Sequence, residues 1–418
     1  MDRMLHRCKI SFVKHKHNKN ALMKFTLAFS SLLLQITTTF AYADGDDTVN
    51  FLIGTDYRHY DNLFLLPEGV SPGGSAKRSD NVLATNFGIN LNKKYGLQTF
   101  KFDYSHIDNK YDNADFLNFN SNNYNAAWLW ALTPSLTGYL SSQRKVDLIP
   151  FIDNRNSNTQ NVRTLELQLF TFDWSPHNVW HLLGGYTKVN SVNSQTFLQE
   201  TSFKLDAFDV GVKYTLPSDS FIALKLRTSN GENQEINISN QVGKGFSENE
   251  AELSAFWKLT GKSSLKANLG HNIHSDDEYN LRDFSGYFGG VNYSWDASEK
   301  LNISANLTRK LSSYQDVTSS YTVNDELSIR PTWALTSKVV IGGSLLASKR
   351  KFLGDGPSAS ATTSTRIDDG FTYGMNVTWM PRSTMQFGVT LQHDERDSNF
   401  ADRDFSSNTV GLNGQLTF

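Results

Sequence analysis

The sequence has one cysteine in 418 residues, and this residue, Cys8, lies near the start of the chain. A lone cysteine excludes an intrachain disulfide and a thiolate metal centre, so the fold must depend on hydrogen bonds and packing. Only nine prolines are present, whereas asparagine, serine and threonine are abundant. This composition favours long hydrogen-bonded strands, because proline removes the backbone donor that a sheet needs.

A long hydrophobic run is also lacking. After Thr39 no stretch is long and apolar enough for a transmembrane helix, which needs about 20 residues. The mean hydropathy of −0.43 is typical of a soluble protein. Outer-membrane β-barrels have similar values, because only alternate residues of each strand face lipid. A soluble β-solenoid or two-sheet domain would share this composition, so strand length and connection pattern must distinguish these classes.

Recognisable catalytic and metal motifs are few. His393 precedes Asp394, and His59 lies close to Asp61, which are the residue types that outer-membrane hydrolases use. Both pairs fall where strands are expected to end, and such residues are normally only solvated. No phosphate-binding glycine loop and no histidine cluster occurs, so the sequence predicts neither an enzyme nor a cofactor. Two acidic clusters supply oxygen atoms of the type that bind Ca²⁺, without the spacing of a known metal loop: 276–278 and 394–397.

The first 43 residues have the organisation of a secretory signal peptide. Basic residues come first, an apolar stretch follows at 25–39, and Ala41-Tyr42-Ala43 then provides the small residues that a signal peptidase recognises. Cleavage is expected before Asp44. The basic segment is unusually long, and translation from Met23 would leave a compact signal peptide. The alternative is a transmembrane anchor, but the apolar stretch is shorter than a spanning helix requires.

Removal of the signal peptide makes the protein more acidic. The full chain has 40 basic and 42 acidic residues, and the first 43 residues contain seven basic residues and one acidic residue, Asp2. The mature chain therefore has 33 basic and 41 acidic residues, a net charge of about −8. This charge disfavours non-specific nucleic-acid binding.

Apolar and polar residues alternate with a period of two in many segments of the mature chain. In the last one, Val410, Leu412, Leu416 and Phe418 share one face, with polar residues between them. Strands of about 10–14 residues suit a tilted membrane strand better than a soluble one of about 5–6. A final strand that ends on Phe is typical of outer-membrane barrels, so Leu416 and Phe418 are the expected signal for barrel assembly. Similar alternation occurs at 265–270, 301–308, 371–379 and 385–392.

Short turns alternate with longer polar links along the chain. Eight turns are expected near residues 93–96, 133–135, 175–178, 217–220, 261–263, 296–300, 335–337 and 381–383. Nine links are expected near 61–79, 108–120, 148–159, 190–201, 230–246, 275–283, 314–319, 350–368 and 395–403. Seventeen connections of this kind predict eighteen strands, an even number as in bacterial single-chain barrels, with sixteen as an alternative. The predicted fold is one all-β, antiparallel up-and-down barrel over residues 44–418, with both termini at the periplasmic, short-turn side.

Tryptophans add a second argument for a membrane barrel. Seven lie beside the short turns: Trp130, Trp174, Trp180, Trp257, Trp295, Trp333 and Trp379. Such a group at one end predicts an aromatic belt at the periplasmic membrane interface. A soluble sandwich has no reason to place its tryptophans at one end.

A short motif, Tyr60-Asp61-Asn62-Leu63-Phe64, follows the first expected strand. This motif, its place soon after the signal peptide and the terminal Phe418 resemble the EpsL-type outer-membrane barrels, a porin-like family encoded in exopolysaccharide operons. The resemblance implies a role in making or exporting a surface polysaccharide, and it implies no catalytic residues. Leu416 departs from the usual insertion pattern, which prefers an aromatic residue two positions before the end.

Five basic residues point inward by phase on four consecutive expected strands, near their short-turn ends: Lys213, Lys225, Arg227, Lys258 and Lys266. A basic patch inside the barrel mouth would focus the electric field on anions, including an acidic polysaccharide. The alternative is ion pairing across strands, for which the candidate partners are Glu166, Asp209, Glu250 and Glu252. The other inward positions, from about residue 264 on, are mostly amides and hydroxyls, which suit sugars but also any porin.

The sequence therefore favours an outer-membrane β-barrel that takes part in exopolysaccharide production or export as a passive conduit. The alternatives are a general diffusion porin for small solutes and a loop-plugged barrel that docks a periplasmic export complex. Expected partners are outer-membrane lipid, lipopolysaccharide and the barrel assembly machinery. The export hypothesis adds the polysaccharide and periplasmic export proteins.

Overall fold

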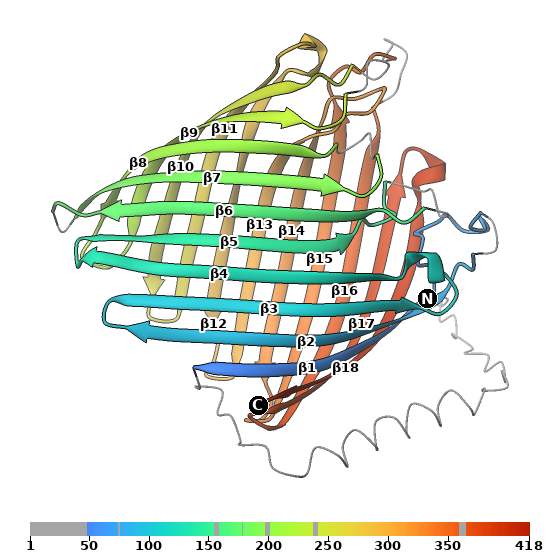
Figure 1. Ribbon diagram of the computed structural model, residues 1–418, viewed down its shortest axis with the longest axis horizontal. Helices are drawn as coiled ribbons and strands as arrows, with labels where there is room; N and C mark the ends of the chain where they lie inside the picture. The colour runs from blue at the N-terminus through green and yellow to red at the C-terminus, as the bar shows by residue number, and fades with distance from the viewer. Residues whose placement is uncertain are drawn as a thin grey trace, which may run out of the picture. The chain divides into compact units, whose positions relative to one another are not determined.

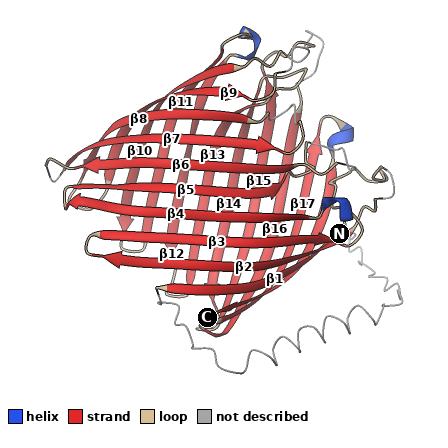
Figure 2. Cartoon of the chain, in the orientation of Figure 1, coloured by secondary structure: helices blue, strands red, loops and turns tan. Residues whose placement is uncertain are grey.

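The computed structural model describes residues 48–73, 76–153, 159–177, 179–196, 201–236, 241–358 and 365–418. The expected signal peptide at 1–43, its cleavage site and Met23 lie outside these residues. The described chain forms one sheet of eighteen strands (Figures 1 and 2). Three one-turn 3₁₀ helices lie in its long links: η1 (Asp115–Leu117), η2 (Asn280–Arg282) and η3 (Ala401–Arg403). Among the described residues, no helix is long and apolar enough to cross a membrane.

The strands follow one another around a closed antiparallel ring. Each pairs with the next along the chain, and β1 also pairs with β18, from Leu52 opposite Thr417 to Tyr60 opposite Thr409. The predicted eighteen strands are confirmed, and sixteen is wrong. The bounds are β1 (Val49–Tyr60), β2 (Asp80–Tyr95), β3 (Gln98–Tyr111), β4 (Phe119–Thr133), β5 (Leu136–Leu148), β6 (Val162–Trp174), β7 (Trp180–Asn193), β8 (Phe203–Thr215), β9 (Phe221–Asn233), β10 (Gly245–Thr260), β11 (Ser263–Asp276), β12 (Phe284–Asp296), β13 (Leu301–Ser313), β14 (Tyr321–Ala334), β15 (Val339–Leu353), β16 (Ile367–Arg382), β17 (Met385–Ser398) and β18 (Phe405–Thr417).

The alternation of side chains gives the ring two different faces. On β9 the outward Leu224 and Leu226 are 51% and 52% exposed, whereas the inward Ala223, which precedes them, is 5% exposed. Exposed Leu, Val, Phe and Trp side chains recur at the outward positions of the other strands. Water would disfavour such a surface, but lipid does not, and the closed ring leaves no unpaired sheet edge in the membrane.

The connections alternate as the sequence predicts. Short connections of two to five residues follow the even-numbered strands, and links of six to nineteen residues follow the odd-numbered ones. The turn after β2 contains Gly96 at a φ of +59°, a left-handed conformation that glycine adopts without strain. Val49 and Thr417, the two ends of the sheet, both lie at the short-turn end.

The expected tryptophan belt lies on the outer face at the short-turn end. Six of the seven predicted members are 42–59% exposed. Trp130 is the exception at 9% exposure, because its ring lies over Gly138 and stacks on Phe170 with centroids 6.0 Å apart. Trp128, which the sequence analysis did not assign to the belt, is 37% exposed and stacks on Phe100.

The expected assembly signal, Leu416 and Phe418, lies at the end of the last strand. Leu416 lies opposite Ile53 of β1 and Met385 of β17, and Phe418 follows the last residue of β18. The closing strand therefore has β-neighbours on both sides. Recognition of Leu416 and Phe418 by the assembly machinery remains a prediction.

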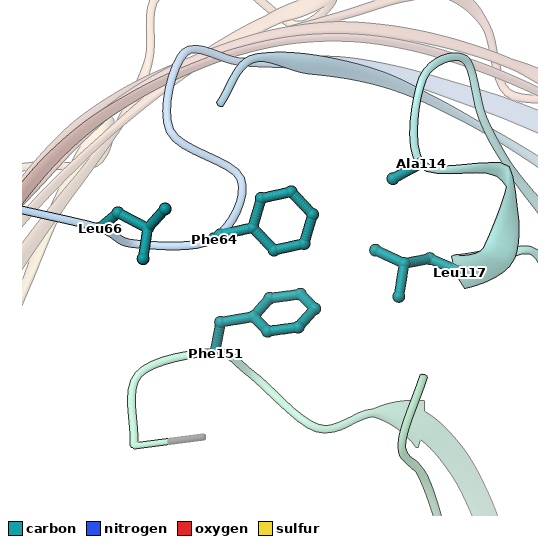
Figure 3. Packing of buried hydrophobic residues seen from close by; sticks show 5 residues of the cluster. All are labelled: Phe64, Leu66, Ala114, Leu117 and Phe151. Carbon is teal, nitrogen blue, oxygen red and sulfur yellow. The ribbon is translucent and has the colours of Figure 1, made fainter. Parts of the chain in front are cut away.

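Parts of three long links pack together at the other end of the barrel, which we call the mouth. Figure 3 shows Phe64 and Phe151 facing each other, with Leu66, Ala114 and Leu117 around them. The two phenyl rings meet edge to face with centroids 4.8 Å apart. These five residues, the mouth cluster, are all buried. The links at 61–79, 112–118 and 149–161 thus share an apolar core of their own.

The motif at residues 60–64 ties this cluster to the closing strand. Asn62 is 1% exposed, and its side-chain amide donates to the carbonyl oxygens of Leu66 and Ser406. Asp61 accepts hydrogen bonds of 2.7 Å from the backbone and side-chain amides of Asn408. The motif thereby fastens the first link to β18 and places Phe64 in the mouth cluster, so its Asn and Phe side chains are structural.

Phe64→Ala should undock the first link, because removing a buried phenyl ring costs about 3–5 kcal/mol. Phe116→Ala is the matched control, since Phe116 lies in η1 and is 38% exposed. Hydrogen exchange of the Leu65 and Leu117 amides, which donate to Asn62 and Ala114, would report docking. The heat-dependent gel shift of folded barrels would confirm ring closure. Equal protection in both variants would contradict the role of Phe64.

Candidate functional site

The five predicted basic residues lie together on the inner wall. Alternation places Lys213 on β8, Lys225 and Arg227 on β9, Lys258 on β10 and Lys266 on β11, all out of phase with the exposed apolar positions. These neighbouring strands present one surface, which we call the inner basic wall. Arg227 lies at the middle of β9. The prediction that it lies near the short-turn end of the strand is therefore wrong.

Two of these lysines have partners that the sequence analysis did not propose. Lys213 forms an ion pair with Asp173 of β6, whose other carboxylate oxygen lies 2.6 Å from Nδ1 of His181. Lys258 lies 2.6 Å from Asp219, in the short connection between β8 and β9. Asp173 is two strands away from Lys213, so the long lysine side chain reaches it diagonally across β7.

Glu166, one of the four predicted partners, faces outward. Its position on β6 shares the phase of the exposed Phe170, and it pairs with Arg144 of β5 at 3.5 Å. Pairing between Glu166 and the inner basic wall is therefore wrong. The reason is that residues an even number apart on a strand share a face.

Lys225 and Arg227 lie opposite the other predicted partners in the sheet register. Lys225 is opposite Glu252, and Arg227 lies between Asp209 of β8 and Glu250 of β10. In the described part of the chain, neither basic side chain forms a hydrogen bond or an ion pair within 4.0 Å. Lys266 lies 5.8 Å above the ring of Phe256. These three cations therefore face the barrel interior with acidic groups near, but not bound to, two of them.

An acidic row on β10 adjoins the inner basic wall. Glu248, Glu250 and Glu252 all point inward, toward the mouth from Lys258. Glu248 lies 3.0 Å from Nδ1 of His274, and Glu252 accepts a hydrogen bond of 3.0 Å from Asn268. The sequence analysis considered Glu250 and Glu252 only as pairing partners. The sequence signal for this row was the presence of a glutamate at every second residue, because such residues share one face of a strand.

A buried cluster of charges lies at the mouth, which the sequence analysis missed. Asp153, from the link between β5 and β6, lies 2.7 Å from Arg350 of β15 and 3.2 Å from Arg366, just before β16. Arg366 also binds Asp368 at 2.6 Å, and Arg396 of β17 donates to the carbonyl oxygen of Ile152 at 2.9 Å. We call this set the arginine clasp: Asp153, Arg350, Arg366, Asp368 and Arg396. Since β6 and β15–β17 are not neighbours in the sheet, the link must cross the mouth to reach it.

The clasp holds Asp153 ionised. Burial alone would raise the pKa of this carboxyl, which is 7% exposed, but the charges of Arg350, Arg366 and Arg396 hold the pKa below its usual value. A second link joins here, because Arg350 lies 5.2 Å over the ring of Tyr314. Burial, and then the nearby Asp153 charge, raises the pKa of Tyr314. The clasp therefore ties two long links to the barrel wall.

The predicted histidine–acid pairs do not come together. His393 faces outward, with Nδ1 2.8 Å from Asn408, whereas Asp394 faces inward and accepts from Thr372. His59 binds Asn81, and Asp61 binds Asn408. Within the described ranges, no group of three or more His, Cys, Asp or Glu side chains is placed to hold a metal ion. In the acidic cluster at 276–278, the Asp276 carboxylate accepts the backbone amide of Glu278.

Asp153→Asn should weaken the clasp at neutral pH, because breaking a buried ion pair costs about 3–5 kcal/mol. The folded pKa of Asp153 lies below its unfolded value of about 3.9, so its contribution is complete above that pH and is lost as pH falls through the folded pKa. Urea midpoints of wild type and variant should differ at pH 7 and converge well below pH 4. Asp369→Asn, at a side chain 57% exposed, is the control and should change little at either pH. A difference that persists in strong acid would refute this account.

The comparisons with known proteins agree with this fold. Residues 258–418 match the family model described as "Putative beta-barrel porin 2". No curated protein sequence matches the chain.

Two solved structures from Pseudomonas aeruginosa are similar in fold. The outer membrane protein OpdK has a TM-score of 0.50 and 10% identity, over 88% of this chain and 99% of that one. OpdQ has a TM-score of 0.50 and 12% identity, over 89% and 99% respectively. The chain is thus a closed, eighteen-stranded outer-membrane β-barrel, and its C-terminal part matches a porin family model.

Proposed function

We propose that this barrel is a passive diffusion porin for small hydrophilic solutes, with a preference for anions. The observation that carries the proposal is the inner basic wall, in which Lys225, Arg227 and Lys266 face the interior of the closed ring without an ion pair in the described chain. A ring of eighteen strands is wide enough to leave an aqueous channel. Charged groups on its wall then select among solutes.

Anion preference rests on where the charges of the wall lie rather than on their sum, because the five basic residues are at least matched in number by Asp173, Asp209, Asp219 and the acidic row. At the short-turn end, Lys213 and Lys258 are neutralised by Asp173 and Asp219, but Lys225 and Lys266 are not. At the mouth, the arginine clasp contains three arginines and two aspartates, which leaves one positive charge. The acidic row on β10 opposes these fields between the two ends. The low-dielectric protein wall focuses the electric fields of these groups into the channel. Their combined effect should therefore be measurable as ion selectivity.

Export of a polysaccharide fits these observations less well. The clasp and the mouth cluster bring long links across the opening through which a polymer would pass. The motif that suggested the export family has its Asn62 and Phe64 side chains buried at 1% exposure, where they contact the fold rather than a solute. A small solute needs a narrower opening between these links than a polymer does. A barrel plugged by its links would, by contrast, conduct almost no current.

Lys225→Glu combined with Arg227→Glu should shift the channel from anion toward cation preference, because four charge units change on one inward strand. Reversal potentials in planar bilayers under a salt gradient would measure the shift. Lys188→Glu combined with Lys204→Glu is the matched control, since alternation places both side chains on the outer face. Identical reversal potentials in wild type and the inward double variant would contradict the proposed role of the inner basic wall in anion selectivity.

Asp153→Ala should increase single-channel conductance, because the link at 149–161 loses its anchor to β15–β17. The same recording on Asp369→Ala, an outward and exposed partner of Lys349, should match wild type. Near-zero conductance in wild type and variant alike would favour a plugged docking barrel over a porin.

A further inference from the structure

A cavity of about 320 Å³ lies at the mouth, above the inner basic wall and on the same strands. We infer that this cavity is a binding subsite for a single neutral sugar ring. The inference rests on the proposed porin function, which it deepens by naming a class of solute. Residues of β6, β8–β11 and β13 line it, together with Gln315 from the link at 314–320.

The polar lining is held in place by its own hydrogen bonds. The Thr201 hydroxyl lies 2.9 Å from the side-chain oxygen of Asn233 and 3.2 Å from that of Gln315, and its single proton is available to either acceptor. Glu248 lies 3.0 Å from Nδ1 of His274. Asn233, Gln315 and His274 are 5%, 8% and 4% exposed. A polar site that is fixed before the ligand arrives loses little conformational entropy on binding.

The apolar lining forms a corner of two aromatic rings. Phe203 and Phe246 meet edge to face, with centroids 6.4 Å apart and planes at 65°. Phe246 is in turn stacked on His274 at 5.2 Å, which fixes its orientation. One side of the cavity is therefore rigid and apolar, while the other offers amide, carboxylate and hydroxyl groups. A pyranose ring has the matching character, because its C–H faces are apolar and its rim carries hydroxyls that both donate and accept.

Charge and size narrow the class of ligand further. Among the described residues, the lining contains one guanidinium, Arg163, which donates to Asn193, and one carboxylate, Glu248, so their formal charges cancel. A neutral ligand is favoured over a uronate at this level of the barrel, in contrast to the basic wall below it. The volume lies at the lower limit for small-molecule sites, about 300 Å³, which suits one ring rather than an oligosaccharide.

Saturation-transfer NMR on the detergent-solubilised protein would test the inference with methyl α-D-glucopyranoside as the probe. We expect saturable binding in wild type. Phe246→Leu and Glu248→Gln should each weaken it roughly tenfold, because the first removes an aromatic face and the second replaces a charged hydrogen-bond acceptor with a neutral one. Glu252→Gln and Phe256→Leu, which change inward residues of the same strand outside the cavity, are the matched controls and should bind as wild type does. The heat-dependent gel shift would verify that every variant is folded.

Three results would overturn the subsite. These are no saturable glucoside signal in wild type, stronger binding of glucuronate or L-serine than of the glucoside, or equal losses in the cavity variants and their controls. The binding assay needs no current through the channel. Glucoside binding by a barrel that does not conduct would therefore support the subsite while contradicting the porin, and conductance without binding would do the reverse.

Discussion

Pairing of β1 with β18 is the interaction on which the rest of the structure depends. In lipid an unpaired backbone amide or carbonyl has no water to bind, so a spanning sheet must close on itself. The register from Leu52 and Thr417 to Tyr60 and Thr409 provides that closure. It also defines an inside, which allows the outer face to be apolar while charged residues gather within. The inner basic wall, the acidic row and the mouth links all exist in a space that this pairing creates.

The interior is organised in levels along one set of strands. Strands β8–β11 carry basic residues toward the short turns, acidic residues above them and the lining of the open cavity at the mouth. The arginine clasp lies elsewhere on the ring and holds a crossing link in place. A solute that enters from the mouth would thus pass the proposed subsite, whose Arg163 and Glu248 have opposite charges, before it reaches the lysines. Glu248 belongs to both levels, since it lines the cavity and begins the acidic row.

Much of the barrel could be predicted from the sequence, because alternation and turns are local properties. Eighteen strands, the alternating connections and the inward phase of Lys225 and Arg227 follow from residues close together in the chain. The partners of these groups do not. Asp173 reaches Lys213 across an intervening strand, and Asp153 meets Arg350 from a link nearly two hundred residues away. Such contacts depend on the curvature of the ring and on how the links fold inward. Neither property produces a periodic pattern in the sequence.

Asn62 has a consequence for assembly. Its amide binds the carbonyl oxygen of Ser406, and its own carbonyl accepts from the Ser407 hydroxyl, so its docking site is built from the last strand of the chain. The first link is made early in synthesis, and these hydrogen bonds can form only after β18 has been made. A truncated chain that lacks β18 would therefore lose the hydrogen bonds that hold its first link as well as the closure of its wall.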